Sequence, residues 1–154
     1  MSLTVRELIA IPTLRTRLIA GASGLDRPVT WAHSCELPEP WQWMGSGDLV
    51  MTVGHEFPAT GREQVAYLER LAEADLSGLV LAEGLFAAPV TDLAAQAADR
   101  LAFPSMYAWT CGVDTEILQS ACRCRTTVRD VAVGEQCGAL INRGSRLVRR
   151  YERC

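Results

Sequence analysis

Short apolar runs alternate with amphipathic stretches from residue 48 onward, and this alternation sets the expected fold. The apolar runs are typical of buried strands, and the stretches between them repeat apolar residues with the 3.6-residue period of a helix. In order, the elements are a strand over 48–53, a helix over 60–74, a strand over 77–82, a helix over 91–102 and a strand over 105–109. This order implies parallel strands joined by right-handed crossovers, with helices packed on the sheet. The sequence therefore predicts an α/β fold with a βαβαβ half.

Each of the two predicted helices carries one apolar stripe. Thr60 and Glu63 have the spacing of a capping box, in which each side chain satisfies a backbone amide at the helix start. Residues three and four apart share a helix face, so the stripe should face the sheet. The side chains expected inward are Val65, Leu68, Leu71, Ala72, Leu93, Ala94, Ala97 and Leu101.

The chain before residue 37 predicts a short helix and two further strands. Thr4 and Glu7 form another capping box, and the helix that they open should end before Pro12. A brief strand over 17–20 enters a glycine-rich turn, after which 29–36 alternates with the period of two that suits a strand. Because the connection is short, we expect these two strands to be antiparallel neighbours, which makes the sheet mixed.

Two tryptophans, Trp41 and Trp43, lie in a short helical segment over 39–44. One interpretation is that they are amphipathic plugs over the edge of the sheet. The other is that they form a stacking wall for a planar ligand, since aromatic rings offer flat apolar surface. The sequence leaves both open.

Composition restricts where the chain works and what it binds. Hydrophobic residues make up 49% of it, enough for a real core, but no apolar run reaches the roughly 18 residues of a membrane span. The start of the chain does not have the pattern of a signal peptide, so we expect a cytoplasmic protein without a membrane partner. Residues 1–110 carry a net charge of −6, which does not attract nucleic-acid phosphates.

The character of the chain changes near residue 110. Residues 111–154 carry a net charge of +3, and five of the six cysteines lie there. We expect a domain over 1–110 and an atypical Cys/Arg-rich tail over 111–154, produced by a shifted reading frame or a truncated gene, because off-frame translation of GC-rich DNA enriches Arg and Cys. The alternative is a genuine basic segment. The cysteines lack zinc-ligand spacing, so no metal is expected.

Catalytic chemistry is not indicated. His33, Ser34, Cys35 and Glu36 include the residue types of a catalytic triad, but neighbours on a strand point to opposite faces. The glycine-rich stretches GASG and GSGD lack the spacing of nucleotide-binding loops. We therefore expect neither an enzyme nor a cofactor.

Several segments together carry a family resemblance. GLDRPV, SCELPEP, a tryptophan and GSGDLVMTVG follow one another between residues 24 and 54, and TVRELIAIPTL and YLERLAEADLSGLVL flank them. Over residues 4–104 the chain resembles the N-terminal domain of PucR-type purine catabolism regulators. The resemblance implies a regulatory, effector-sensing domain that sits ahead of a DNA-binding helix-turn-helix, and no helix-turn-helix is recognisable in this sequence.

A purine-related effector is planar and rich in hydrogen-bonding groups, so its site needs an aromatic face and a few polar groups. In a parallel sheet such a site lies beyond the carboxyl ends of the strands. The candidate ligand-binding residues are Arg27, His33, Glu36, Trp41, Thr52, His55 and Glu83. For Arg27 the alternative is a structural salt bridge with Asp26 within the turn.

The expected partners are a small-molecule effector and a second copy of the chain, with no direct nucleic-acid binding by this chain alone. The alternative function is a ligand-free interaction module that dimerises through the sheet edge or through the surface of Trp41 and Trp43.

Overall fold

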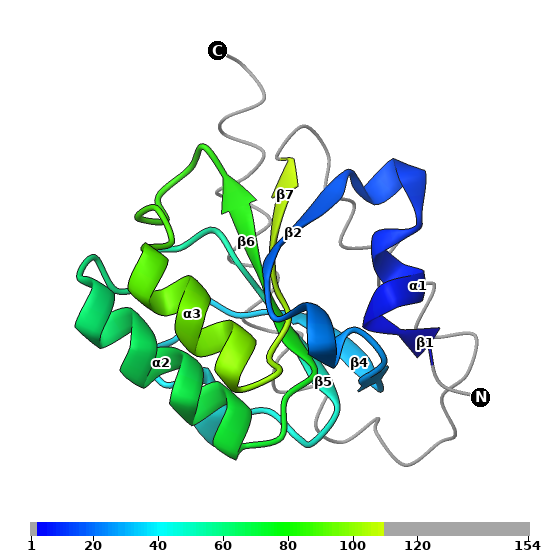
Figure 1. The fold of residues 1–154 in the computed structure, drawn as a ribbon, viewed down its shortest axis with the longest axis horizontal. Helices are drawn as coiled ribbons and strands as arrows, with labels where there is room; N and C mark the ends of the chain where they lie inside the picture. The colour runs from blue at the N-terminus through cyan, green and yellow to red at the C-terminus, as the bar shows by residue number, and fades with distance from the viewer. Residues whose placement is uncertain (1–2, 110–154) are drawn as a thin grey trace.

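The computed structural model describes residues 3–109, and their centre is a five-stranded mixed sheet in the order β2-β7-β6-β5-β4 (Figure 1). Four strands are parallel to one another: β4 (Trp31–Ser34), β5 (Asp48–Thr52), β6 (Gly78–Glu83) and β7 (Ser105–Trp109). The fifth, β2 (Thr16–Ala20), pairs with β7 in the antiparallel sense. The predicted α/β fold with a mixed sheet is confirmed.

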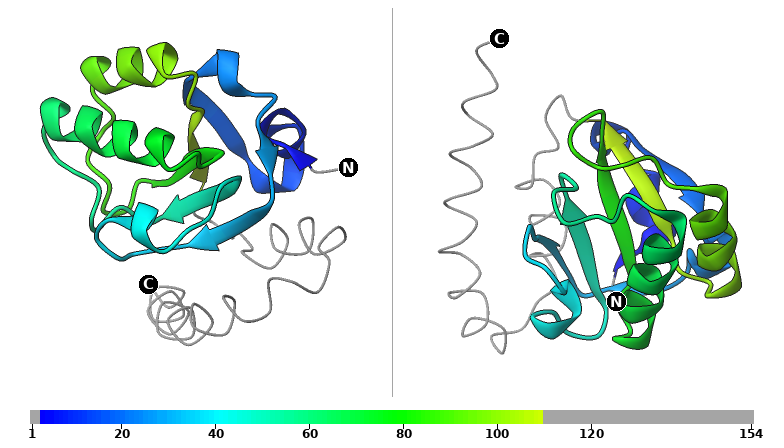
Figure 2. Two further views of the ribbon diagram at one scale, coloured as in Figure 1. Left: turned by 90° about the horizontal axis from the view of Figure 1, so that it is seen from below. Right: turned by 90° about the vertical axis from the view of Figure 1, so that its left-hand side faces the viewer.

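The two longer helices lie side by side on one face of this sheet, as Figure 2 shows. Helix α2 (Gly61–Glu73) connects β5 to β6, and α3 (Asp92–Arg100) connects β6 to β7, so the predicted βαβαβ unit is present. Thr60 caps α2 and Thr91 caps α3, each accepting a hydrogen bond from a backbone amide of the first turn. These caps satisfy amides that a helix start otherwise leaves without a partner.

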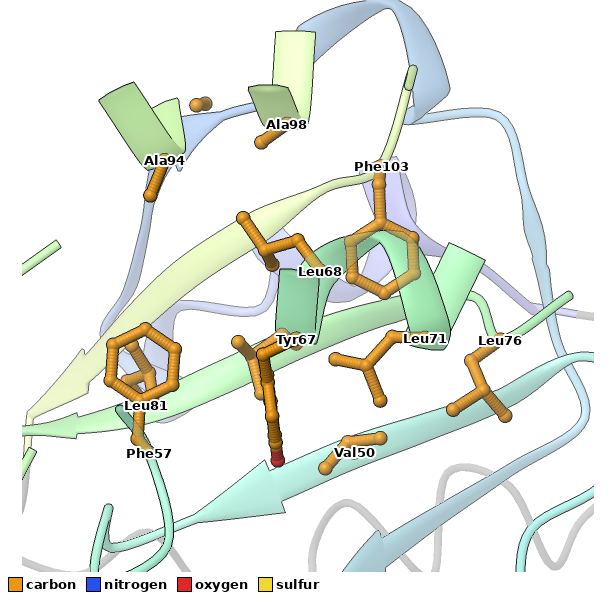
Figure 3. Packing of buried hydrophobic residues seen from close by; sticks show 12 residues of the cluster. Val50, Phe57, Tyr67, Leu68, Leu71, Leu76, Leu81, Ala94, Ala98 and Phe103 are labelled. Atoms are coloured by element: carbon orange, nitrogen blue, oxygen red, sulfur yellow. The ribbon is translucent and has the colours of Figure 1, made fainter. Parts of the chain in front are cut away.

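The core consists of two layers, one on each face of the sheet. On the helix side, apolar residues of α2 and α3 pack on Val50, Leu79 and Leu81, with Phe103 at one end (Figure 3). On the other side, Leu49, Met51, Val80 and Met106 pack against the N-terminal segment. Alternate residues of β5 thus enter opposite layers, which is why the whole strand is buried.

Small elements of the N-terminal segment cover the second face and the end of the sheet where the parallel strands begin. They are β1 (Leu3–Thr4), α1 (Val5–Ile9), the 3-10 turns η1 (Pro12–Leu14) and η2 (Ala22–Gly24), and β3 (Pro28–Val29), which pairs with β1. The predicted capping box at Thr4 is present, and its helix ends before Pro12. A third 3-10 turn, η3 (Pro40–Gln42), contains Trp41 and occupies part of the predicted helical segment.

The predicted pairing of 17–20 with 29–36 is wrong. The second segment divides into β3 and β4, and β4 lies at the opposite edge of the sheet from β2. The reason is that 21–30 passes along the end of the sheet where the parallel strands begin, and it bonds to residues that precede β5, β6 and β7. The Thr30 amide donates to the Gly47 carbonyl at 2.7 Å, and the Gly21 amide donates to Asp99 at 2.7 Å.

The predicted helix faces are partly corrected. Leu93 is 53% exposed, and Ala98 takes its place in the buried stripe of α3. In α2, Val65 and Ala72 are only half-buried, whereas Gln64 and Tyr67 are buried. Gln64 is buried because its amide donates to the Pro58 and Pro89 carbonyls, both at 3.0 Å, and joins the loops before the two helices.

Two further expectations concern the domain boundary and membrane-spanning helices. The predicted boundary at residue 110 and the predicted tail over 111–154 lie outside the described residues. Of the helices in residues 3–109, none is long and apolar enough to cross a membrane.

Candidate functional site

Glu36 and Thr52 meet beyond the carboxyl ends of the parallel strands β4 and β5. We call this end of the sheet the carboxyl edge. The Thr52 hydroxyl donates to Glu36 Oε2 at 2.9 Å, and the Val53 amide donates to Glu36 Oε1 at 2.6 Å. The Gly54 amide in turn donates to Thr52 Oγ1 at 2.9 Å. This is the edge at which ligands bind in open α/β sheets. The structure therefore brings two of the predicted site residues into one hydrogen-bonded group.

His55 and Glu83 lie at the same edge but take part in separate contacts. The His55 ring stacks on Phe86 with a centroid separation of 4.0 Å, and both side chains are exposed. Glu83, at the end of β6, accepts a hydrogen bond from Arg17 at 2.6 Å. The Arg17 guanidinium also lies over the Tyr107 ring, 4.8 Å from its centroid. The carboxyl edge thus has a charged side at β6 and β7 and an aromatic pair beside β5.

His33 is buried within β4, close to the start of β5. Its Nε2 lies 3.3 Å from Asp48 Oδ2, and the same oxygen accepts a hydrogen bond from the Gly45 amide at 2.9 Å. Asp48 and its neighbours lie at the amino end of β5. The contacts of His33 therefore fix the turn that leads into β5, and they do not join it to Glu36 and Thr52.

Arg27 lies at the opposite end of the sheet from this group, where the parallel strands begin. It donates to the Ala102 carbonyl at 3.0 Å and to the Leu76 carbonyl at 3.1 Å, and it lies 3.6 Å from Asp75. These carbonyls belong to the segments that lead into β6 and β7. Arg27 is therefore placed to hold the segment over 21–30, which we call the crossing segment, against the sheet. It is far from the carboxyl ends of the strands.

The alternative salt bridge between Asp26 and Arg27 does not form. Asp26 instead pairs with Arg6 of α1 at 2.8 Å. The hydrogen bond and charge of the Arg6 guanidinium lower the pKa of Asp26. Both side chains are exposed, so this pair contributes little to stability.

Replacing Arg27 with alanine should lower the free energy of unfolding by about 2–3 kcal/mol, because two carbonyls lose a charged donor. Arg27→Lys should recover only part of the loss, since an ammonium cannot reproduce the planar fork that reaches both carbonyls. Urea unfolding followed by circular dichroism measures both variants. A loss below about 0.5 kcal/mol in Arg27→Ala would contradict this structural role.

Trp41 packs on the structure as a plug and also borders a shallow hollow. Its ring is half-buried and meets Tyr67 of α2 edge-on at 5.4 Å. Phe57 also contacts the Tyr67 ring edge-on, with a centroid separation of 5.7 Å. The open hollow beside them has a volume of about 290 Å³, and Trp41, Pro58 and Tyr67 are among the residues that line it. Both interpretations of Trp41 thus have a structural counterpart.

Tyr67 is the residue that the sequence prediction missed. Burial raises the pKa of its hydroxyl, and Cys35, Glu36 and Glu56 raise that pKa further. These three groups follow β4 and β5, so Tyr67 reaches from α2 to the carboxyl edge. Its spacing from Leu68 and Leu71 places it on the buried face of the helix, and that spacing was the available signal.

The raised pKa predicts a loss of stability in alkali. Above about pH 10, the ordinary tyrosine value, the unfolded chain releases the Tyr67 proton while the folded protein keeps it. The folded state then binds more protons, so its stability falls as pH rises, by up to about 1.4 kcal/mol per pH unit from this group. Unfolding of the parent protein and of Tyr67→Phe between about pH 9 and 11 measures the difference; equal slopes would contradict the prediction.

Comparison with known proteins adds to this geometry. Residues 7–106 match the model of the purine catabolism regulatory protein-like family. The chain is also 44% identical over 102 residues to the transcriptional activator PmfR of Paenarthrobacter nicotinovorans. The matched region is 66% of this chain and 22% of that protein, so the chain spans only about a fifth of the length of this relative. The chain belongs to the purine catabolism regulatory protein-like family.

Proposed function

We propose that residues 3–109 are an effector-sensing domain of a transcriptional regulator. The observation that carries this proposal is the family match over 7–106, which includes both long helices and nearly all of the five-stranded sheet. The related protein PmfR is a transcriptional activator. Purine-related metabolites are the first class of effector to test, because the family description names purine catabolism.

The carboxyl edge supports a sensing role by its chemistry. Glu36 and Thr52 supply polar groups at the ends of two adjacent strands, while Trp41 and Tyr67 supply apolar ring surface beside them. A few directed polar groups next to aromatic side chains are typical of small-molecule sites. A ligand that bound there would hold the ends of β4 and β5 together and could shift a conformational equilibrium felt elsewhere in a larger regulator.

In this proposal, another part of the regulator contacts DNA. Among residues 3–109 the two long helices, α2 and α3, are separated by β6 and lie side by side on the sheet. A helix-turn-helix needs two helices joined by a short turn. The domain would therefore act indirectly on a DNA-binding element elsewhere in the regulator. We further propose that it does so as a homodimer.

Thermal-shift measurements on the 154-residue chain test the sensing role. Purines, allantoin and amino acids are added at increasing concentration, and a compound that binds only the native state must raise the midpoint. At about 100 times its Kd such a ligand adds about 2.7 kcal/mol of stability. If neither these compounds nor organic amines raise the midpoint at saturating concentration, the sensing role is wrong.

The second candidate is an interaction module that binds no effector. Trp43 favours it, because this large apolar side chain is 58% exposed beside the partly covered Trp41. Trp43→Ala should shift a monomer–dimer equilibrium toward monomer by about tenfold, a typical effect of truncating an interface tryptophan. Sedimentation equilibrium measures the shift, with exposed Leu93→Ala as the control. An unchanged equilibrium in Trp43→Ala would exclude this surface.

A further inference from the structure

The Tyr67 hydroxyl has no hydrogen-bond partner within residues 3–109, although the side chain is only 8% exposed. The ring contacts both Trp41 and Phe57 edge-on, and Figure 3 shows its oxygen directed at the carboxyl end of β5. In this part of the chain, the side-chain oxygens that are fully buried and lack a hydrogen-bond partner are Thr16 Oγ1 and Ser105 Oγ. The Tyr67 oxygen is not among them, so it keeps some contact with solvent. Buried phenols usually find a partner. This hydroxyl is therefore free to bind a ligand.

Glu36 is bonded to the end of β5, toward which the Tyr67 oxygen points, and it lacks a counter-charge. The carboxylate is half-buried, and its hydrogen bonds come from a hydroxyl and a backbone amide, both neutral donors. No ion pair joins it to a cationic side chain within the described range. Because a carboxylate has about four lone-pair positions, two remain for further donors. A partly buried anion with spare acceptor capacity favours a cationic partner.

The surrounding residues add to the negative potential. Glu56, in the loop after β5, is near enough for its charge to act on Tyr67. Arg70 borders the neighbouring hollow, but it lies 3.5 Å from Glu73 and is paired with it. The nearest imidazole, His55, stacks on Phe86. The site thus repels anions and attracts cations.

We propose that the site formed by Glu36 and Tyr67 binds a small organic cation, a protonated amine. The ammonium would donate to the Glu36 carboxylate and to the Tyr67 oxygen, and its carbon chain would lie in the hollow beside Trp41. This inference rests on the proposed sensing role and names the chemical class of the effector. An ammonium group of this kind stays charged at about pH 7.

An amine fits the site better than a metal ion does. Residues 3–109 contain no group of three or more His, Cys, Asp or Glu side chains placed to hold a metal. The adjoining hollow, of about 290 Å³, is lined mostly by carbon and has room for an apolar substituent. Aromatic rings such as Trp41 also attract organic cations through their negative faces. The ligand is therefore expected to carry both a charge and an apolar part.

Benzylamine and benzoate are matched probes of this charge preference. Each is titrated into the 154-residue chain at low salt while the amide NMR signals of Val53 and Gly54 are followed. Benzylamine should bind with a Kd on the order of 1 mM and weaken in high salt, and benzoate should not shift these signals. Benzoate binding as tight as benzylamine, or no benzylamine binding at about 20 mM, would overturn the proposal.

Three variants separate the site from a general effect of charge. Glu36→Gln keeps one oxygen, which can still accept from the Val53 amide, and its NH2 group can donate to the Thr52 hydroxyl oxygen. It should weaken benzylamine binding about tenfold or more. Tyr67→Phe should weaken it about threefold to tenfold, with little change in the unfolding midpoint because no bond within the protein is lost. Glu69→Gln removes a charge that pairs with Arg100 at 2.9 Å and should change the Kd less than about twofold. Equal effects of all three variants would overturn the proposal.

The two proposals fail in different ways. If a neutral or anionic metabolite raises the thermal midpoint and benzylamine does not bind, the sensing role stands and the amine site is wrong. If no metabolite of any charge raises the midpoint, and benzylamine still binds through Glu36 and Tyr67, the amine site stands without a sensing role.

Discussion

Gly21→Ala should destabilise the protein by about 3–5 kcal/mol, because two costs fall on the same residue. Gly21 adopts φ +82°, a left-handed conformation that L side chains rarely take. A Cβ at this position would also lie 2.1 Å from the Phe103 carbonyl oxygen, a backbone atom that cannot turn aside. Either the crossing segment or the start of β7 would have to move.

Gly84→Ala is the matched control for this prediction. Gly84 has nearly the same backbone angle, φ +78°, but a Cβ there would have no neighbour within 4 Å. It should therefore cost only the conformational term, about 1–2 kcal/mol. Urea unfolding of both variants measures the difference. If the two substitutions cost the same, the close approach of 21–30 to the sheet contributes nothing, and the account of the crossing segment is wrong.

The parallel half of the fold follows from local signals. Thr60 and Thr91 cap helices at the positions where a short polar side chain precedes an amphipathic stretch. The apolar runs that became β5, β6 and β7 are too short for a buried helix and lack the polar positions of a half-exposed strand. Each of these features depends on a few neighbouring residues, so the sequence alone was sufficient to predict them.

The path of the N-terminal segment depends on distant residues and could not be predicted in the same way. A short connection normally favours neighbouring antiparallel strands. Here β7 takes the place beside β2, and the bonds that guide the crossing segment end on Leu76, Asp99 and Ala102. No pattern within 16–36 reports those partners. The prediction thus missed both the strand order and the division of the second segment into β3 and β4.

The candidate site shows the same division. Glu36 and Thr52 were predicted because polar residues after apolar strands collect at one edge of a parallel sheet. Arg27 was wrongly grouped with them. Its true partners are the carbonyls of Leu76 and Ala102, which are far from it in sequence, so no local pattern showed that it lies at the other end of the strands. Tyr67 was missed, since its contacts with Trp41 and Phe57 come from segments far from it in sequence.

Leu71→Ala should lower the free energy of unfolding by about 3–5 kcal/mol, and Leu93→Ala by less than about 0.5 kcal/mol. The two substitutions remove the same atoms from helices on the same face of the sheet. Leu71 is fully buried in the layer between α2 and the sheet, so its truncation removes apolar contacts and leaves a cavity (Figure 3). Leu93, in the first turn of α3, is 53% exposed.

Helical spacing alone assigned both leucines to the buried stripe, whereas the packing in the structure buries only Leu71. This pair of variants therefore tests whether spacing or packing correctly describes the burial of Leu93. The stripe of α3 consists of Ala94, Ala97 and Ala98, whose small side chains let the helix approach α2 closely. Leu93 falls one position outside that stripe. Guanidinium unfolding of the two variants, with the slope of the transition as a check on two-state behaviour, gives both values. A loss of about 3 kcal/mol or more in Leu93→Ala would mean that α3 turns this leucine toward the sheet, and the packing of the helix layer would then have to be redrawn.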